Sequence, residues 1–252
     1  MTETWDVSAK VLCKGKINAN NGQNYIRFIL MDEEGSKMEA MAFGKACFTT
    51  NQGISEGEVY NFTSVGFGST HDVYLYKLFY IRREYYVNIT TETEIKIPEM
   101  KISIPLLPRT FMEFKMVPFC PHRTYTDVIG VIVYISDITG EDNSRLQRSK
   151  YVAIMDSRGN MITVHVRGTK FFQNNNEWRE QEKVFQTMAA VHVKVNKKKA
   201  ILATTPYSEI IFSPKWAEAK ELEEFQNHLL RDRQRAQRFA RKCMLRLRVK
   251  KK

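Results

Sequence analysis

The sequence predicts an all-β protein made of two tandem five-stranded barrels followed by a C-terminal α-helix. Two segments, 29–48 and 153–172, align without a gap at an offset of 124 residues. Each lies among short stretches of alternating apolar and polar residues that end in turn-forming residues. The length of 252 residues suits two domains of common size. These observations together indicate one β architecture used twice.

Five residues are identical between the two copies, and they lie where the backbone is most constrained. In each copy an apolar strand leads into a turn that ends in Gly. A second strand follows, and then a Gly-led polar segment that ends on an aromatic residue. A repeat of this length indicates a duplicated domain rather than a solenoid. The identical pairs are Met31/Met155, Asp32/Asp156, Gly35/Gly159, Gly44/Gly168 and Phe48/Phe172.

The first copy is expected to contain five strands, with a short helix between the third and the fourth. Alternating apolar residues define the strands, and runs such as Asn20-Asn21-Gly22 and 66–70 are typical of turns. The expected strands are Trp5–Lys16, Tyr25–Met31, Met38–Phe43, Glu58–Val65 and Val73–Ile81, and the expected helical segment is Gly44–Thr50.

The second copy repeats this order of elements. Its third strand separates into an apolar face and a polar face, as a half-buried strand does. The connection 137–150 is long and polar. The expected strands are Asp127–Ser136, Tyr151–Met155, Met161–Arg167, Thr187–Val195 and Lys199–Thr204, with a helical segment that starts at Gly168.

These elements define the expected domain organisation. We expect the first barrel domain over residues 1–97 and the second over 125–212. Residues 98–124 contain five prolines and are expected to form a semi-extended connector. Residues 213–252 are expected to form a basic helix and tail, because Ser213-Pro214 offers an N-cap followed by Pro at the first helical position.

Five short strands with a helix between the third and the fourth is the order of the OB-fold. This fold is a partly open Greek-key barrel, and it binds oligonucleotides on its second and third strands and on the loops after strands one and four. An SH3-like barrel has a similar number of strands, but the helix after strand three favours the OB-fold.

The positive charge of the chain is concentrated at its C-terminus. The formal net charge is +11. Residues 229–252 contain eleven Lys and Arg against one acid, Asp232, whereas residues 1–228 are close to neutral with 28 basic and 27 acidic side chains. The isoelectric point of about 9.4 is therefore a property of the tail and does not indicate a uniformly basic protein.

Cysteine usage and hydropathy indicate an intracellular protein. The four cysteines, Cys13, Cys47, Cys120 and Cys243, form no CxxC pair, which favours reduced thiols over a disulfide framework or a zinc site. No apolar run approaches the length of a membrane span, and the N-terminus lacks the features of a signal peptide. We expect no membrane partner and a location in the cytosol or the nucleus.

Short runs in both copies carry a family resemblance. In the first copy, the runs 28–35, 40–43 and 59–62 resemble the first central DNA-binding domain of the replication protein A large subunit. In the second copy, the runs 127–130 and 154–159 are similar to the domain that follows it in that subunit.

The resemblance extends over residues 3–215 and includes the order of the two domains. It implies a tandem OB-fold protein that binds single-stranded DNA in the nucleus. It also implies a role in DNA replication, repair, recombination or telomere maintenance. Single-stranded RNA is an alternative ligand, because grooves of this kind stack the bases of either nucleic acid.

The resemblance also implies which residues bind nucleic acid in the first copy. The two stacking aromatic residues of the family lie at positions that match Phe43, at the end of strand three, and Tyr74, on strand five. Phe67, expected in the loop after strand four, is a further candidate for stacking. The alternative is that these rings only pack in the barrel. The nearest cations for phosphate are Lys14, Lys16, Arg27 and Lys45.

The second copy departs from the family at both stacking positions. Arg167 stands where the family has Trp at the end of strand three. Lys197, Lys198 and Lys199 stand where it has Phe in the last hairpin. An Arg stacks on bases or pairs with phosphate, so binding by this copy is expected to rely more on electrostatics. The alternative for the three lysines is an ordinary solvated hairpin tip.

The C-terminal segment has two interpretations. Apolar residues recur at helical spacing over 214–248, which favours a helix that binds a protein partner and an adaptor function for the chain. The basic run after Arg231 also suits nucleic-acid binding or nuclear import. The residues of the apolar stripe are Leu222, Phe225, Leu229, Ala236, Phe239, Ala240 and Met244.

Motifs of the common enzyme classes are absent from the sequence. It contains no P-loop, GxSxG, HExxH or paired-carboxylate signature, and its five histidines are isolated. We therefore expect a non-enzymatic protein that holds no cofactor and no metal ion.

Overall fold

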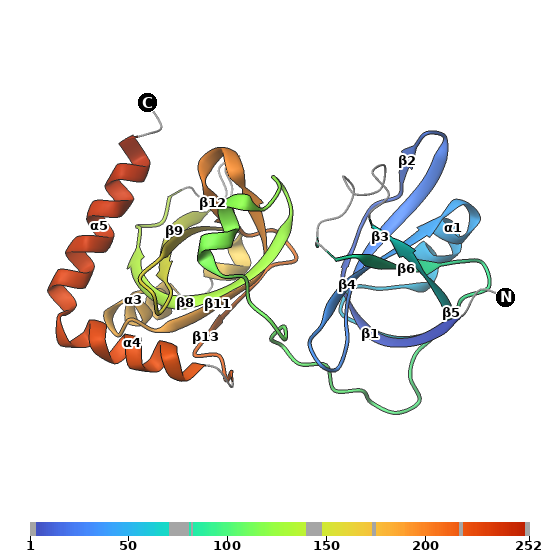
Figure 1. The fold of residues 1–252 in the computed structure, drawn as a ribbon, viewed down its shortest axis with the longest axis horizontal. Helices are drawn as coiled ribbons and strands as arrows, with labels where there is room; N and C mark the ends of the chain where they lie inside the picture. Colours follow the sequence, from blue (N-terminus) through green and yellow to red (C-terminus); the bar gives the residue numbers. More distant parts are fainter. Residues whose placement is uncertain are drawn as a thin grey trace. The chain divides into compact units, whose positions relative to one another are not determined.

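The protein consists of two compact units, Met1–Thr110 and Phe111–Lys252. Its structure is a computed structural model that describes residues 4–70, 81, 83–139, 148–172, 175–216 and 219–249. The first unit is a β-barrel with one α-helix, and the second is a β-barrel that carries the C-terminal helices (Figure 1). The all-β prediction with two five-stranded barrels is therefore confirmed.

The barrel of the first unit closes in the order β1-β3-β4-β6-β5, with β5 pairing back onto β1. β4 and β6 run parallel, the other neighbours run antiparallel, and a helix connects β4 to β5. This order and the position of the helix define the OB-fold. The elements are β1 Trp5–Lys14, β3 Gln23–Met31, β4 Lys37–Phe43, α1 Gly44–Gly53, β5 Val59–Ser69 and β6 Tyr85–Ile89, with β2 Asn18–Asn20 beside β3 and β7 Glu94–Lys96 beside β5.

The barrel of the second unit has the same topology, β8-β9-β10-β12-β11, again closed by its first and fourth strands. Its fifth strand runs parallel to its third. The elements are β8 Tyr125–Ile135, β9 Ser149–Met155, β10 Met161–Arg167, η2 Thr169–Phe172, α3 Asn175–Lys183, β11 Thr187–Asn196, η3 Lys197–Lys199 and β12 Ile201–Ala203, with β13 Glu209–Phe212 beside β11.

Cross-strand pairs of residues in the first barrel have equivalents in the second barrel at an offset of 124 residues. Tyr25 lies opposite Phe43 between β3 and β4, and Ser149 lies opposite Arg167 between β9 and β10. The turns also match, because the first residue of each, Asp32 or Asp156, accepts hydrogen bonds at Oδ1 from the backbone N–H groups two and four residues later. Gly in each turn has a positive φ, near 80°, which side chains disfavour. The duplication is therefore structural.

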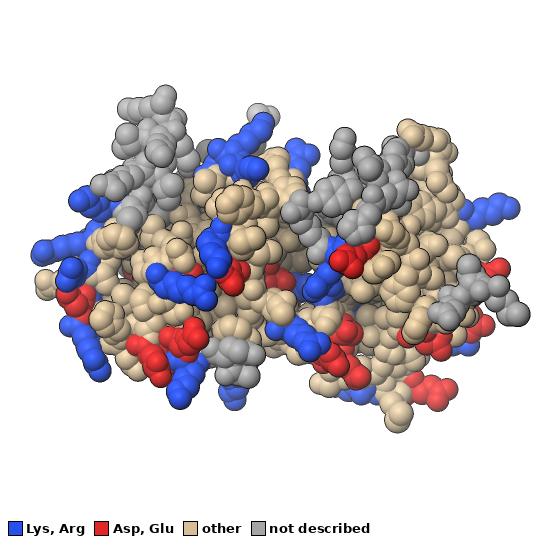
Figure 2. Space-filling view, viewed as in Figure 1, with Lys and Arg blue, Asp and Glu red and all other residues tan. Residues whose placement is uncertain are grey.

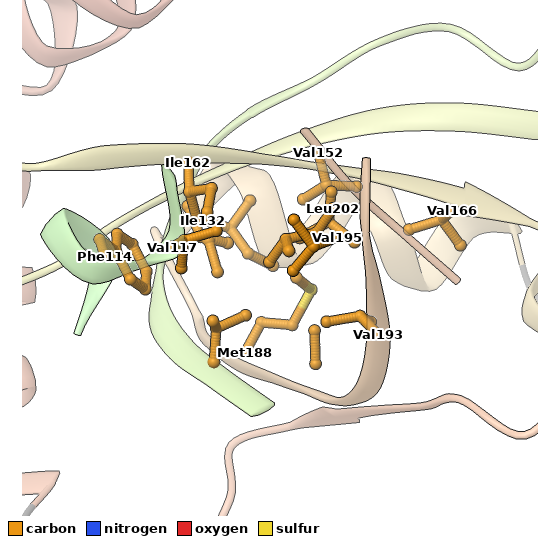
Figure 3. Packing of buried hydrophobic residues seen from close by; sticks show 14 of the residues in the cluster. Phe114, Val117, Ile132, Val152, Ile162, Val166, Met188, Val193, Val195 and Leu202 are labelled. Carbon is orange, nitrogen blue, oxygen red and sulfur yellow. The ribbon is translucent and has the colours of Figure 1, made fainter. Parts of the chain in front are cut away.

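Each barrel has its own hydrophobic core, formed by the inward residues of the alternating strands. The second core also takes up Phe114 and Val117 from a 3₁₀ helix, η1 Phe114–Phe119, as Figure 3 shows. Gly130 makes room for this helix, because a Cβ there would lie 2.8 Å from Cζ of Phe114. Part of the expected connector 98–124 thus belongs to the second core.

The fifth strand of the first barrel differs from the sequence prediction. It was expected at Val73–Ile81, but the barrel closes through β6, Tyr85–Ile89. Residues 71–80 lie outside the described residues. The run 66–70 was interpreted as a turn because of its two glycines. Gly66 to Ser69 instead extend β5 and pair with β6.

The C-terminal helical segment divides into α4, Lys220–Arg231, and α5, Arg233–Val249 (Figure 1). The break falls at Asp232, whose Oδ1 accepts a hydrogen bond from the Arg235 N–H and so caps α5. The helix was expected to begin at Pro214, but residues 214–216 are irregular. None of the described helices combines the length and the apolar character needed to cross a membrane.

Candidate nucleic-acid interface

The outer face of β3, β4 and β6 carries three aromatic side chains that contact one another. Tyr25 and Phe43 lie directly opposite each other with ring centroids 6.4 Å apart, and Tyr86 packs edge-on against Phe43, also at 6.4 Å. Met41 is fully buried among them. We call Tyr25, Phe43 and Tyr86 the groove cluster, because they lie on the OB-fold face that receives oligonucleotides.

Only Phe43 of the groove cluster keeps a substantial accessible area. Tyr25 and Tyr86 are buried, whereas Phe43 is partly exposed at the junction of β4 and α1. The two tyrosine rings therefore support Phe43 from its sides. A base that stacks on this face would meet a ring that is already positioned by its neighbours.

The position of Tyr86 depends on a glycine in the neighbouring strand. Gly68 lies directly opposite Tyr86, and a Cβ at Gly68 would lie 2.2 Å from Cζ of the ring. The ring thus occupies the place that any larger residue would need. The glycine that resembled a turn residue in the sequence serves this close contact.

Arg27 and Glu39 form an ion pair beside the groove cluster. Arg27 Nη1 lies 3.8 Å from Glu39 Oε1, and Glu39 is almost fully buried. The other carboxylate oxygen of Glu39 accepts a hydrogen bond from the Ile81 N–H at 3.3 Å. Arg27, which the sequence suggested as a phosphate ligand, therefore balances a buried acid.

Two of the remaining predicted cations of the first barrel are accessible. Lys14 is not, since its Nζ donates hydrogen bonds to the carbonyls of Asn51 and Ile54, at 2.5 and 2.7 Å, at the C-terminal end of α1. Cations are favoured there by the helix dipole. Lys16, after β1, and Lys45, in the first turn of α1, are both exposed.

The two other aromatic candidates of the first barrel are not in the groove cluster. Tyr74 lies outside the described residues. Phe67 was expected in a loop, but it lies within β5 and pairs with Val87 of β6. Its side chain points to the other face of the strand from Gly68, because neighbouring residues alternate. Tyr25 and Tyr86 had no distinctive signal in the sequence.

The equivalent face of the second barrel presents a cation in place of Phe43. Arg167 is exposed at the end of β10, and its Nε donates a hydrogen bond to Nδ1 of His165 at 3.1 Å. His165 stacks on Tyr151 across the strand pair, with ring centroids 4.3 Å apart. The hydroxyl of Thr204 bonds to both the N–H and the carbonyl of Arg167. This face is therefore built around a positioned guanidinium.

Strand pairing adds further cations to the three lysines of the β11–β12 hairpin. Lys194 lies opposite Tyr125, with its Nζ 5.5 Å from the centre of that ring, and Arg123 donates its N–H to the Val195 carbonyl. Arg123 is exposed, as are all three hairpin lysines. We call Arg123, Lys194, Lys197, Lys198 and Lys199 the basic corner. The sequence pointed to the hairpin lysines and missed the other two.

Further cations lie on α5. This helix carries seven Lys and Arg and no acid. Among its described side chains, Arg235 lies 4.0 Å from Asp232, the residue before the helix. Figure 2 shows Lys and Arg scattered over the face of the second unit that is in view, mixed with Asp and Glu. The excess of positive charge of the second unit therefore comes largely from α5 and the residues after it.

A pocket of about 220 Å³ lies where α4 joins the second barrel. Three of its charged side chains pair with one another. Glu113 lies 2.7 Å from Lys115 and 3.5 Å from Arg158, and the hydrogen bond from Lys115 holds the pKa of the Glu113 carboxyl below its ordinary value. Phe111 and Trp216 pack edge-to-face at 5.2 Å. The pocket therefore favours no single class of ligand.

No metal centre emerges from the part of the chain that the structure describes. Its His, Cys, Asp and Glu side chains form no group of three that could hold an ion. Cys13, Cys47 and Cys120 are buried and form no disulfide, and burial raises the pKa of the Cys47 thiol above its ordinary value.

One family model matches the chain. It is described as a domain of unknown function (DUF8448), and it covers residues 112–203, which hold the five strands of the second barrel. No curated protein matches.

Several solved structures are similar to the chain at low identity. A replication protein A heterotrimer bound to single-stranded DNA has 17% identity and a TM-score of 0.46, covering 90% of this chain and 52% of that one. The present chain thus spans about half the length of that relative. A murine DNA-binding protein with double-stranded DNA has 12% identity and a TM-score of 0.34, covering 84% and 97%. The tetrameric p202 HIN2 domain has 11% identity and a TM-score of 0.37, covering 84% and 93%.

Proposed function

We propose that this chain is a non-enzymatic protein that binds single-stranded DNA, with bases stacked on the first barrel and phosphates held by the second unit. The observation that carries the proposal is the groove cluster. A partly exposed Phe43 lies on the nucleic-acid face of an OB-fold and is supported by Tyr25 and Tyr86, each at 6.4 Å. Stacking of one base on such a ring is worth about 1–3 kcal/mol.

The distribution of charge supports a division of labour between the units. Residues 1–110 contain 12 Lys and Arg against 13 Asp and Glu, a net charge of −1, whereas residues 111–252 contain 27 against 15, a net charge of +12. Phosphates are therefore attracted to the second unit, through Arg167, the basic corner and α5. Counterion release makes this part of the affinity depend on salt, whereas stacking depends on it much less.

The resemblance to the replication protein A large subunit supports single-stranded DNA as the ligand and the nucleus as the compartment. It also supports a role in DNA replication, repair, recombination or telomere maintenance. In this proposal the basic segment after Arg231 has a second use as a nuclear import signal.

Binding of a fluorescent oligothymidine to the full chain, measured by anisotropy, tests the proposal. Phe43→Ala should weaken binding by about 5-fold or more, because a stacking interaction is lost. Phe48→Ala is the matched control, since Phe48 is an exposed aromatic residue on α1 outside the groove cluster. If the wild-type chain does not bind, or if Phe43→Ala binds as tightly as the control, the stacking proposal is wrong. Competition with oligouridine of equal length then separates DNA from RNA as the preferred ligand.

A second candidate function is an adaptor that binds protein through α4 and α5. The observation that favours it is the exposure of Leu230 and Phe239 on these helices, at 41% and 53%. Light scattering of the full chain and of a chain that ends at Asp232 tests this function. A shorter chain that ends at Thr205 is unsuitable, because β13 would be lost from the second barrel. Self-association that disappears on removal of α5, together with no oligonucleotide binding, would favour the adaptor.

A further inference from the structure

Three large aromatic side chains of the first barrel are exposed next to one another. Trp5 is 52% exposed, Phe67 43% and Tyr85 54%. They come from β1, β5 and β6, three strands that are neighbours in the barrel. Single exposed aromatic residues are common on protein surfaces, but a contiguous group of three indicates a binding surface. We call Trp5, Phe67 and Tyr85 the exposed trio.

Strand register brings the exposed trio together. Trp5 lies opposite Val65, two residues before Phe67, and Tyr85 lies opposite Ser69, two residues after it. Residues two apart on a strand share a face, so all three side chains point to the same side. Trp5 and Phe67 pack edge-to-face, with ring centroids 6.1 Å apart and planes at 71°. Both rings remain exposed in this arrangement.

The exposed trio and the groove cluster occupy opposite faces of the β5–β6 ribbon. Tyr85 and Tyr86 are consecutive in β6 and therefore point in opposite directions. Tyr86 lies over Gly68 in the groove cluster, whereas Tyr85 belongs to the same face as Phe67. The two groups of rings are thus the two sides of one two-stranded element.

We propose that the exposed trio is a second stacking site for the bases of a single strand, in addition to Phe43. This inference rests on the proposed function. Two features favour bases as the occupant. The trio consists of aromatic rings without an exposed aliphatic side chain beside them in β5 or β6, and it shares the β5–β6 ribbon with Tyr86 of the groove cluster. Stacking on rings tolerates any base, so this site adds affinity without sequence preference.

The low net charge of the first unit predicts that binding at the exposed trio depends less on salt than binding at the basic corner. With a net charge of −1, residues 1–110 contribute little to counterion release. Loss of the exposed trio should therefore lower affinity by a similar factor at low and at high salt. Loss of phosphate contacts should instead have its largest effect at low salt.

The test compares Trp5→Ala/Phe67→Ala with Phe48→Ala in the full chain, using an oligothymidine of about 30 nucleotides, longer than the site size of one OB-fold. We expect the double variant to bind about 5-fold or more weakly at both low and high salt, and the control to bind like the wild type. Thermal unfolding of each variant checks that it is folded. Equal affinity of the folded double variant and the control would overturn the inference.

A second measurement needs no variant. Photo-crosslinking of the wild-type chain to an oligonucleotide with 5-iododeoxyuridine, followed by mass spectrometry, should label the peptides that contain Trp5, Phe67 or Tyr85. Labelling confined to peptides outside the trio would overturn the inference. If Phe43→Ala weakens binding but the trio gives no crosslink and no loss of affinity, only this inference fails. If the wild-type chain binds no oligonucleotide, the proposed function fails with it. Loss of self-association alone in the double variant would assign the trio to a protein partner instead.

Discussion

Arg167 and His165 are joined by a hydrogen bond of 3.1 Å from Nε of the guanidinium to Nδ1 of the imidazole. The bond makes Nδ1 of His165 the acceptor of the guanidinium N–H. It also limits the rotamers of Arg167 at the register position where the first barrel has Phe43. The two barrels therefore offer a positioned cation and a positioned ring at the same point of one fold.

Replacing Arg167 should change the salt dependence of oligonucleotide binding. Arg167→Ala removes one phosphate partner, so the slope of log affinity against log salt should decrease by about 0.7 for a single strand. Arg167→Phe should decrease the slope equally but keep more of the affinity, because the ring restores a stacking surface. Anisotropy titrations at several salt concentrations measure both quantities. A slope that does not change in either variant would remove Arg167 from the interface.

Gly68→Ala should destabilise the first unit. The new Cβ would lie 2.2 Å from Cζ of Tyr86, so the ring must move, at a cost of about 1–3 kcal/mol. Gly66→Ala is the matched control, because its Cβ would have no neighbour closer than 3.9 Å. Hydrogen exchange of peptides from β5 and β6 reports on the stability of this ribbon. Similar exchange in the two variants would show that the Tyr86 ring does not prevent a larger residue at position 68.

Neutralising the hairpin lysines of the basic corner should lower the salt slope without affecting stacking. The triple variant of Lys197, Lys198 and Lys199 to Ala should reduce the slope by up to about 2, at about 0.7 for each lost phosphate contact. Addition of Arg123→Ala should reduce it further. Lys101→Ala, an exposed lysine far from this hairpin in the sequence, serves as the control. A triple variant with the slope of the control would indicate a solvated hairpin tip.

The buried cysteines should resist thiol reagents in the folded protein. Cys13, Cys47 and Cys120 are buried, and burial raises the pKa of Cys47, so little reactive thiolate forms at neutral pH. In a Cys243→Ser chain, the three remaining thiols should react with Ellman's reagent only after unfolding in guanidinium chloride. Rapid reaction of the native protein would contradict the burial of these side chains.

The local alternation of apolar and polar residues predicted most strands, but it did not predict the last strand of the first barrel. Met161–Arg167 was predicted residue for residue, since its apolar and polar faces alternate without a break. The fifth strand was misplaced because both 73–81 and 85–89 are rich in aromatic and β-branched residues. Pairing with β4, 47 residues earlier in the chain, selects Tyr85–Ile89, and no local preference reports on that contact.

The candidate sites were also predicted only in part from the sequence. Phe43, Arg167 and the hairpin lysines were found in the sequence, because the repeat and the family resemblance point to their positions. Arg123 lies beside the hairpin lysines only because β8 pairs with β11. Lys14 looked like a phosphate ligand, but its Nζ is held by the end of α1. A charge in the sequence does not show which partner the fold provides for it.

By itself, the sequence determined that this protein is a duplicated OB-fold with different residues at equivalent points of its two copies. Period-two alternation, the Asp-to-Gly turns and the offset of 124 residues are local properties, and they survive in the structure unchanged. Only the tertiary structure decided that Tyr86 supports Phe43 over Gly68, and that Trp5, Phe67 and Tyr85 meet on the opposite face. These contacts join residues far apart in the chain, and they form only when the barrel closes and sets the register between its strands.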